Sequence, residues 1–336
     1  TPPGISLVKV SLWIIRVNNI YPQVGTGSSS DAEFIVNTSL YPLRDRAVFF
    51  KYPRNLYKSL PLILNEDTGD YTNISIHGDE GSYWNRSVVY PKLGYDKYIS
   101  LELMEPNEII GMGLSDEQLF YQSAAILDTT SKPFLSYIIT LTSHIPFNLP
   151  AEYVESFELD NDFDTLYRNY IRSIHYVDRS VGIFLKLLKS NDLLENSLLC
   201  VFGDHSAFST DYINKLKKEE RKGYSDVFNN NGKIPLIFYD KSYGSHVIKK
   251  VGGQIDILPT ILFLIGKNNR DNMKFHIGKN LFLDYDGFAV LPRDEKYVSK
   301  NYNPNLKNFR LNGLKASEWL ISSGYLNKLV LRKYTE

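Results

Sequence analysis

The stretch that most constrains the fold runs from Leu198 to His205, with the sequence Leu-Leu-Cys-Val-Phe-Gly-Asp-His. Its five apolar residues predict a strand buried on both faces, and the glycine that follows ends that strand. A carboxylate and an imidazole come next. In open α/β sheets the functional groups gather beyond the carboxyl ends of the strands, so Asp204 and His205 are candidate ligands for a divalent cation. On this triplet alone, an Asp that caps a turn and a His on the surface are an equally good interpretation.

Two other predicted strands also end in polar clusters. Residues 71–76 are followed by His77, and residues 134–141 are followed by a Thr-Ser-His sequence that ends at His144. Helical patterns separate the strands, the longest of them an amphipathic helix over residues 167–189. Strands that alternate with helices predict a doubly wound α/β fold, with a mostly parallel central sheet flanked by helices.

Composition excludes several classes of protein. The 336 residues are ample for a large core, in one big α/β domain or in two domains. Thirty-eight basic and 38 acidic residues balance, which argues against nucleic acid as the main partner. The single cysteine, Cys200, excludes an intrachain disulfide and a cysteine-based metal site. No stretch has the length of a membrane span and no signal peptide is visible, so this sequence is expected to lie in water, as a fragment of an anchored protein also would.

Two segments near the ends of the chain set the expected domain organisation. Residues 5–21 are apolar and fit either a strand or a helix. Beyond about residue 280 the pattern changes to two short antiparallel strands, near 287–290 and 296–302, and then to a mostly helical tail. The sequence therefore predicts a large α/β domain over residues 1–283 and a small α+β subdomain over residues 284–336.

A serine cluster precedes the first clear helix. Gly25-Thr26-Gly27-Ser28-Ser29-Ser30 is a hydroxyl-rich turn, and the spacing from Ser30 to Glu33 is that of a capping box. The serines would then lie at a helix N-terminus, where free N–H groups and the helix dipole favour bound anionic oxygen. The alternative is that these serines only cap the helix and form the turn before it.

An aromatic side chain and a guanidinium share the loop after residue 81. Arg86 could grip phosphate with a bidentate fork, and the face of Trp84 could cover the apolar part of a ligand. The alternative, which is the more common fate of such pairs, is a Trp that anchors the loop beside a surface Arg.

Taken together, these segments resemble the alkaline phosphatase/sulfatase superfamily. The resemblance is closest to the extracellular catalytic domain of lipoteichoic acid synthases, the phosphoglycerol transferases of Gram-positive bacteria. The matching segments, in the family's order and spacing, are Gly25 to Phe34, His77 to Arg86, Thr140 to Phe147, Gly203 to His205 and Gly253 to Thr260.

The resemblance assigns roles to individual residues. Ser29 falls on the family's threonine nucleophile, with Ser28 and Ser30 as rivals for that role. Asp204 and His205 fall on metal ligands, with the Ser29 hydroxyl as a third, and Mn²⁺ is the expected metal, with Mg²⁺ as the alternative. The pocket for glycerophosphate falls on His77, Trp84, Arg86 and His144.

The resemblance also implies substrates and a location. The implied reaction moves glycerophosphate from phosphatidylglycerol to a lipoteichoic-acid-type polymer through a covalent phospho-serine. The implied place is the extracellular face of the bacterial membrane, reached through an N-terminal anchor that is not part of this chain. A monomer and no nucleic-acid partner are expected.

Two departures from the family keep other functions open. Serine replaces threonine at the nucleophile, and residues 1–30 contain no Asp or Glu, whereas the family's first metal ligand is a Glu upstream of the nucleophile. A non-catalytic relative that binds glycerophosphate and a related phosphodiesterase or sulfatase-type hydrolase are therefore the alternatives. A sulfatase is the weaker one, because Ser29 is followed by Ser30 and Asp31 rather than by a Cys/Ser-x-Pro-x-Arg motif.

Overall fold

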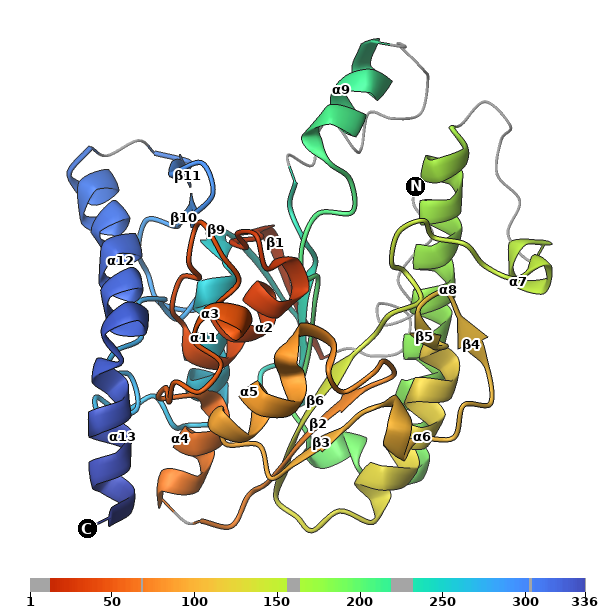
Figure 1. Ribbon diagram of the computed structural model, residues 1–336, viewed down its shortest axis with the longest axis horizontal. Coiled ribbons are helices and arrows are strands. Elements are labelled where there is room, and N and C mark those ends of the chain that lie inside the picture. The colour runs from red at the N-terminus through yellow and green to blue at the C-terminus, as the bar shows by residue number, and fades with distance from the viewer. Residues whose placement is uncertain (1–12, 68, 156–163, 219–231, 302–303, 336) are drawn as a thin grey trace.

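Two sheets form the centre of the computed structural model (Figure 1), which describes residues 13–67, 69–155, 164–218, 232–301 and 304–335. One sheet has the strand order β7-β8-β1-β9 and the other has the order β3-β2-β6. Their strands are β1 (Ile14–Tyr21), β2 (Thr72–His77), β3 (Lys97–Ile99), β6 (Phe134–Ile139), β7 (Leu199–Phe202), β8 (Leu236–Tyr239) and β9 (His246–Gly253). The apolar stretch at residues 5–21 is thus a strand from Ile14 onward, and residues 5–12 lie outside the described part.

Helices cover both faces of the four-stranded sheet because its side chains alternate in direction. Ile14 of β1 and Ile237 of β8 face the long helices α6 (Asp116–Asp128) and α8 (Thr165–Ser190). Their chain neighbours face the opposite side, toward α2 (Ser28–Thr38) and α11 (Ile257–Leu264). Figure 1 shows the same layers, with α6 and α8 on the right and α2 and α11 on the left. The predicted doubly wound α/β architecture is confirmed.

The strand directions are mixed rather than uniformly parallel. The pairs β2–β3, β2–β6 and β1–β9 are parallel, whereas β8 runs antiparallel to both β1 and β7. The functional clusters still follow strand ends, as expected from the sequence.

The edges of the two sheets meet without pairing. β6 and β7 are the edge strands of their sheets, and every residue in both is only half-buried. Their side chains nevertheless pack together, with the rings of Tyr137 and Phe202 6.3 Å apart between centroids. The run from Leu198 to Phe202 packs against core on both faces of the sheet, as expected, but its residues are only half-buried, because an edge strand lacks the second neighbour that would complete its burial.

The tail after residue 286 contains the predicted short strands and helices. β10 (Phe288–Leu291) and β11 (Lys296–Ser299) pair antiparallel, and α12 (Pro304–Ser323) and α13 (Tyr325–Thr335) follow. The amide of Tyr41 donates to the hydroxyl of Ser317 at 2.9 Å, so α12 is tied to the core. The boundary at residue 283 stays a prediction.

The remaining elements connect these layers. They are α3 (Val48–Lys51), α4 (Leu60–Asp67), η1 (Tyr83–Asn85), α5 (Arg86–Lys92), η2 (Leu101–Leu103), β4 (Ile109–Ile110), β5 (Gly113–Leu114), α7 (Ala151–Glu155), η3 (Leu194–Asn196), α9 (Thr210–Lys218) and η4 (Gln254–Asp256). Within the described residues, every helix is too short or too polar to cross a membrane.

Candidate active site

Three side chains converge at the start of α2. The hydroxyl of Ser29 donates to Asp204 Oδ2 at 2.6 Å and lies 3.3 Å from Nε2 of His205. The same His205 nitrogen lies 3.4 Å from Asp204 Oδ2. Asp204 and His205 follow β7, and Ser29 follows β1, so the site forms at strand ends of the four-stranded sheet. The structure brings together the three residues that the sequence assigned to metal binding and catalysis.

The neighbouring serines have different surroundings. Ser30 is buried, and its hydroxyl donates to the Gly27 carbonyl at 2.8 Å inside the first helical turn. Ser28 opens the helix with a φ of +45°, which is uncommon for a side-chain-bearing residue. Of the three serines, Ser29 is the one whose hydroxyl contacts Asp204 and His205.

The turn before α2 is shaped around a buried carboxylate. Oδ2 of Asp31 accepts from the amides of Gly25 and Gly27, both at 2.9 Å. A side chain at Gly27 would place its Cβ 2.3 Å from Asp31 Oδ1, so only glycine fits there. Burial raises the pKa of Asp31 to about 6, although the Gly27 and Gly25 amides favour the charged form.

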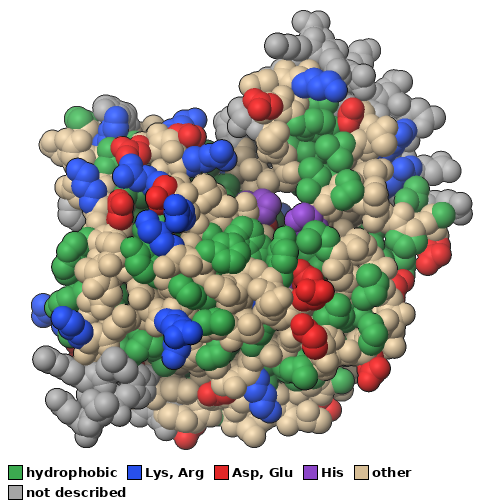
Figure 2. Space-filling view, viewed as in Figure 1, with side chains coloured by type: hydrophobic (Ala, Val, Ile, Leu, Met, Phe, Trp, Pro, Cys, Tyr) green, Lys and Arg blue, Asp and Glu red, His purple; other side chains and the backbone are tan. Residues whose placement is uncertain are grey.

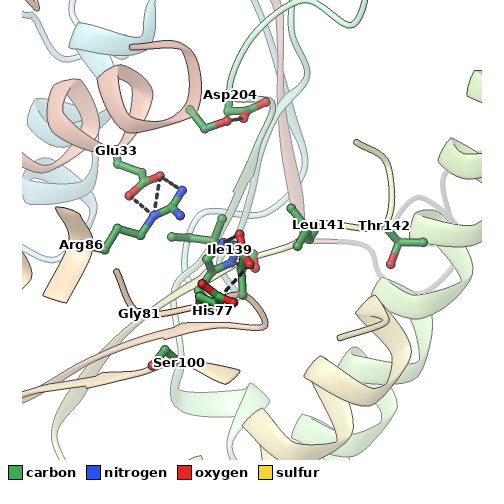
Figure 3. A network of polar contacts seen from close by, with 12 residues as sticks. Glu33, His77, Gly81, Arg86, Ser100, Ile139, Leu141, Thr142 and Asp204 are labelled. Carbon is green, nitrogen blue, oxygen red and sulfur yellow. Dashed lines mark hydrogen bonds and ion pairs between the residues drawn. The ribbon is translucent and has the colours of Figure 1, made fainter. Parts of the chain in front are cut away.

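The predicted capping box does not form. Gly27 occupies the N-cap position, the helix begins at Ser28, and Glu33 does not fold back on the helix start. Glu33 instead holds Arg86 (Figure 3), with Arg86 Nη2 at 2.7 Å and Nε at 3.1 Å from its carboxylate oxygens. The hydroxyl of Tyr90 also donates to Glu33, at 2.8 Å. A buried guanidinium competes for the carboxylate more strongly than a solvated helix end does.

One nitrogen of the Arg86 guanidinium, Nη1, does not contact Glu33. The side chains of Arg86 and Glu33 are 2% and 3% exposed, and Nη1 of Arg86 is buried without a hydrogen-bond partner within the described part of the chain. Burial lowers the pKa of this guanidinium, but the Glu33 carboxylate outweighs that effect and raises the pKa above its usual value. Arg86 is therefore charged, with a free donor, as a phosphate-binding residue requires. It is not the surface residue of the alternative interpretation.

His77 is a buried, neutral imidazole beside this arginine. Its Nδ1 lies 2.9 Å from the Ile139 carbonyl at the end of β6, and its Nε2 lies 4.0 Å from Asp79 Oδ2. Burial, and then the charge of Arg86, lower the pKa of His77 to about 3. The interaction with Ile139 is one that a ring N–H would make, which leaves Nε2 as a lone-pair acceptor.

The other two predicted pocket residues are more exposed than Arg86 and His77. Trp84 sits in η1 with a φ of +54°, two residues before Arg86, and packs against Phe50 and Tyr83. His144 is exposed in the turn after β6, and its Nδ1 lies 2.8 Å from the carbonyl of Ile145. Among the described residues, the polar contacts of His144 stay within its own turn, so the structure does not join it to the other site residues.

Other residues hold the site in place. The amide group of Gln254 donates to the carbonyls of Gly203 and Asp204, at 3.2 and 2.5 Å, and its oxygen accepts from the amide of Gln23. The carboxylate of Asp116 accepts from the amides of two residues in the turn that carries His144, and burial raises its pKa. Neither Gln254 nor Asp116 was predicted as a positioning residue, and Glu33 was predicted as part of a capping box rather than as the partner of Arg86. The position of Glu33 next to the apolar residues after Ser30 could have indicated that its carboxylate is buried and needs a charged partner.

The three convergent atoms fit a divalent metal as part of its coordination shell. A carboxylate oxygen, an imidazole nitrogen and a hydroxyl oxygen suit Mn²⁺ or Mg²⁺, and each lies within 3.4 Å of the other two. The Asp204 side chain is 48% exposed, so the cluster opens to solvent on one side. Within the residues that the structure describes, no three His, Cys, Asp or Glu side chains gather at one point, so a second carboxylate is not part of this set.

Comparisons with known proteins identify the family of the chain. The sequence profile described as Sulfatase matches residues 10–267. Lipoteichoic acid synthase 1 of Bacillus subtilis is 33% identical over 288 residues, which are 85% of this chain and 44% of that protein. Lipoteichoic acid synthase of Staphylococcus aureus is 32% identical over 293 residues, again 44% of its length. The chain thus spans less than half the length of these curated relatives.

Solved structures give the same fold. The lipoteichoic acid synthase LtaP from Listeria monocytogenes superposes with a TM-score of 0.80 over 94% of this chain and 86% of that chain, at 24% identity. The Streptococcus pyogenes phosphoglycerol transferase GacH, solved with sn-glycerol-1-phosphate, gives a TM-score of 0.60 over 95% of this chain and 79% of that chain, at 18% identity. From its sequence match and its fold, the chain belongs to the sulfatase family.

Proposed function

We propose that this protein transfers glycerophosphate from phosphatidylglycerol to a lipoteichoic-acid-type polymer. The observation that carries the proposal is the position of Ser29 on α2. Its hydroxyl contacts Asp204 and His205, and one helical turn further along, Glu33 presents a buried, charged Arg86 with a free Nη1. One helix therefore carries both the proposed nucleophile and the carboxylate that holds the phosphate-binding arginine.

The chain's own residues account for most of the reaction. Nη1 of Arg86 binds a non-bridging oxygen of the donor phosphate and balances the charge that develops there. The Ser29 oxygen, oriented by its hydrogen bond to Asp204, attacks the phosphorus. The bond from phosphorus to the diacylglycerol oxygen breaks, the proton lost by the serine hydroxyl ends on that departing oxygen, and glycerophosphate stays on Ser29. A glycerol hydroxyl of the polymer then attacks the same phosphorus and releases the serine.

Other groups orient the glycerophosphate. His77 Nε2 can accept a hydrogen bond, as from a glycerol hydroxyl, because this imidazole stays neutral. Trp84 would pack beside the glycerol portion of the ligand, and His144 would help to balance the charge on the phosphate. The exposure of His144 leaves it free to turn toward a bound phosphate.

A divalent metal, with Mn²⁺ first and Mg²⁺ second, would be held by Ser29, Asp204 and His205. Bound there, it would lower the pKa of the serine hydroxyl and polarise the phosphoryl oxygens.

The cellular setting follows from the relatives and belongs to the same proposal. The similarity to lipoteichoic acid synthases suggests an extracellular catalytic domain at the bacterial membrane. The proposed organisation is a catalytic domain over residues 1–283 with a packed subdomain over residues 284–336, acting as a monomer without nucleic acid.

A non-catalytic glycerophosphate-binding protein is the second candidate. The observation that favours it is the three-donor cluster, which contains one carboxylate. A metal held by so few protein groups binds weakly, since each charged oxygen that is missing is replaced by water. A hydrolase that uses water as the acceptor would need the same residues and would differ only in its product.

Turnover of a fluorescent phosphatidylglycerol, with and without added Mn²⁺, separates these functions. A transferase releases diacylglycerol and labels a glycerol acceptor, whereas a hydrolase releases diacylglycerol and free glycerophosphate. Binding of glycerol phosphate without release of diacylglycerol, at saturating Mn²⁺, would contradict the proposed transfer. Calorimetric titration of Mn²⁺ into the wild type and Asp204→Asn measures whether the cluster holds metal at all.

A further inference from the structure

An exposed aromatic group borders the candidate active site. Phe50 is 58% exposed and Tyr83 is 44% exposed, and both pack on Trp84, with ring centroids 5.2 and 6.1 Å from it. Phe50 is on α3 and the other two are in η1. We refer to Phe50, Tyr83 and Trp84 as the aromatic ridge. Exposed apolar groups of this size cost solvation free energy and mark contact surfaces.

The backbone holds the ridge outward. Trp84 and the next residue, Asn85, have φ values of +54° and +61°, in the left-handed region that ordinary side chains avoid. The Asn85 side chain donates to the Phe49 carbonyl at 3.2 Å, which ties η1 to α3. Such strain persists only where surrounding contacts fix it, and here it holds a half-buried indole against the two exposed rings.

Several basic residues lie close in sequence to Phe50 of the ridge. The segment from Arg44 to Arg54 contains four basic residues and one acidic residue, although the whole chain carries no net charge. Arg44 is occupied by Glu295 and Glu318. Arg46 and Arg54 are exposed, and both lie within four residues of Phe50.

This face is visible in Figure 2. Hydrophobic side chains gather beside the hollow in which two histidines are visible, and basic side chains lie to their left with acidic ones among them. Aromatic rings flanked by Lys and Arg are typical of surfaces that insert into the headgroup region of an anionic bilayer. The rings supply apolar contact, and the basic groups approach lipid phosphates.

We propose that the aromatic ridge and the basic residues close in sequence to Phe50 form a docking surface for an anionic phospholipid bilayer. The surface would place the mouth of the site at the level of the lipid headgroups. This inference rests on the proposed function, because it assumes that the phosphatidylglycerol donor is taken directly from the bilayer. Binding itself requires no turnover, so the two can fail separately.

Vesicle partitioning tests the surface directly. The probes are large vesicles of phosphatidylcholine alone and of equal parts phosphatidylcholine and phosphatidylglycerol, sedimented with the protein. The double variant Phe50→Ala/Tyr83→Ala should partition about tenfold more weakly than the wild type onto the mixed vesicles. Arg46→Gln/Arg54→Gln should also lose about tenfold, and this loss should shrink in high salt.

The chain offers matched controls for both variants. Trp319 on α12 is 56% exposed and packs on Tyr325 with centroids 5.3 Å apart, so Trp319→Ala removes an equally exposed, equally paired ring. Lys186→Gln/Lys189→Gln removes two exposed charges from α8. Both controls should partition as the wild type does.

A spectroscopic measurement does not depend on those variants. In a protein with Trp13→Phe and Trp319→Phe, Trp84 is the remaining tryptophan. Its fluorescence should be quenched by brominated phosphatidylglycerol vesicles. Equal partitioning of the ridge variant and Trp319→Ala, or an unquenched Trp84 on bound vesicles, would overturn the docking surface. Normal vesicle binding without phosphoglycerol transfer would support the surface and count against the proposed function instead.

Discussion

Replacing Glu33 by glutamine tests the buried ion pair at the centre of the site. Glutamine has the same size, and its side-chain oxygen can still accept from Tyr90, so packing changes little. The substitution removes the negative charge and places an NH₂ or a neutral oxygen where Arg86 Nε and Nη2 now donate, at 3.1 and 2.7 Å. The guanidinium stays in place, about 2% exposed, with its charge uncompensated.

The expected loss of stability follows from that burial. Removing one partner of a buried ion pair costs about 3–5 kcal/mol of the free energy of unfolding, because the other charge remains desolvated. That is a large part of the roughly 5–15 kcal/mol by which folded proteins are stable. Replacing both partners, in Glu33→Gln/Arg86→Met, removes the stranded charge, so the double variant should lose at least about 2 kcal/mol less than the two single losses combined.

Urea unfolding followed by circular dichroism measures these differences. Glu117→Gln is the matched control, because Arg179 Nη2 lies 2.6 Å from Glu117 in an ion pair near the surface, with side chains 44% and 21% exposed. That control should lose less than about 1 kcal/mol. If Glu33→Gln lost no more than the control, the argument from a desolvated pair would be wrong. If the single variant did not fold, recovery of folding in the double variant would carry the same information.

Three further predictions concern single residues of the site. Ser29→Ala should abolish transfer and change stability little. Ser30→Ala should keep transfer and lose about 1 kcal/mol of the free energy of unfolding, because it loses the hydrogen bond to Gly27. The reverse pattern in a turnover assay would refute the assignment of the nucleophile. Arg86→Lys keeps the charge but not the fork, so affinity for glycerol phosphate should fall at least tenfold by calorimetry, and an unchanged affinity would exclude Arg86 from the pocket. His77 has a folded pKa of about 3 against 6.5 when unfolded, so its contribution to stability is intact above pH 6.5 and is lost as pH falls toward 3, by about 1.4 kcal/mol per pH unit. His77→Gln should flatten that dependence between pH 7 and pH 5 in urea unfolding, and equal slopes would show that His77 is not buried neutral.

The sequence predicted the architecture well where patterns are local. Apolar runs that end in polar clusters placed β2, β6 and β7 and the side chains that follow them, because strand ends and turns depend on nearby residues. Ser29, Asp204 and His205 were assigned together through the resemblance to a family, and the fold brings them into contact across 175 residues. Whether each performs its assigned role stays a prediction.

Long-range pairing was not predictable in the same way. The spacing from Ser30 to Glu33 satisfies the capping-box rule, but the rule does not know that Arg86, 53 residues later, will be buried beside Glu33. Burial of the Leu198–Phe202 strand was likewise overestimated, because apolar character does not reveal whether a strand has neighbours on both edges.

One helix, α2, contacts side chains from both sides of the junction between the two sheets. The sheets do not pair where β6 and β7 meet, so no ladder of backbone hydrogen bonds fixes one relative to the other. α2 lies across both sides of the site. Ser29 contacts residues that follow β7, and Glu33, four residues or about 6 Å further along the axis, holds an arginine from α5, which follows β2. The separation between the nucleophile and the phosphate-binding group is therefore set by the rise of a helix, which is far less variable than the packing of two unpaired edges.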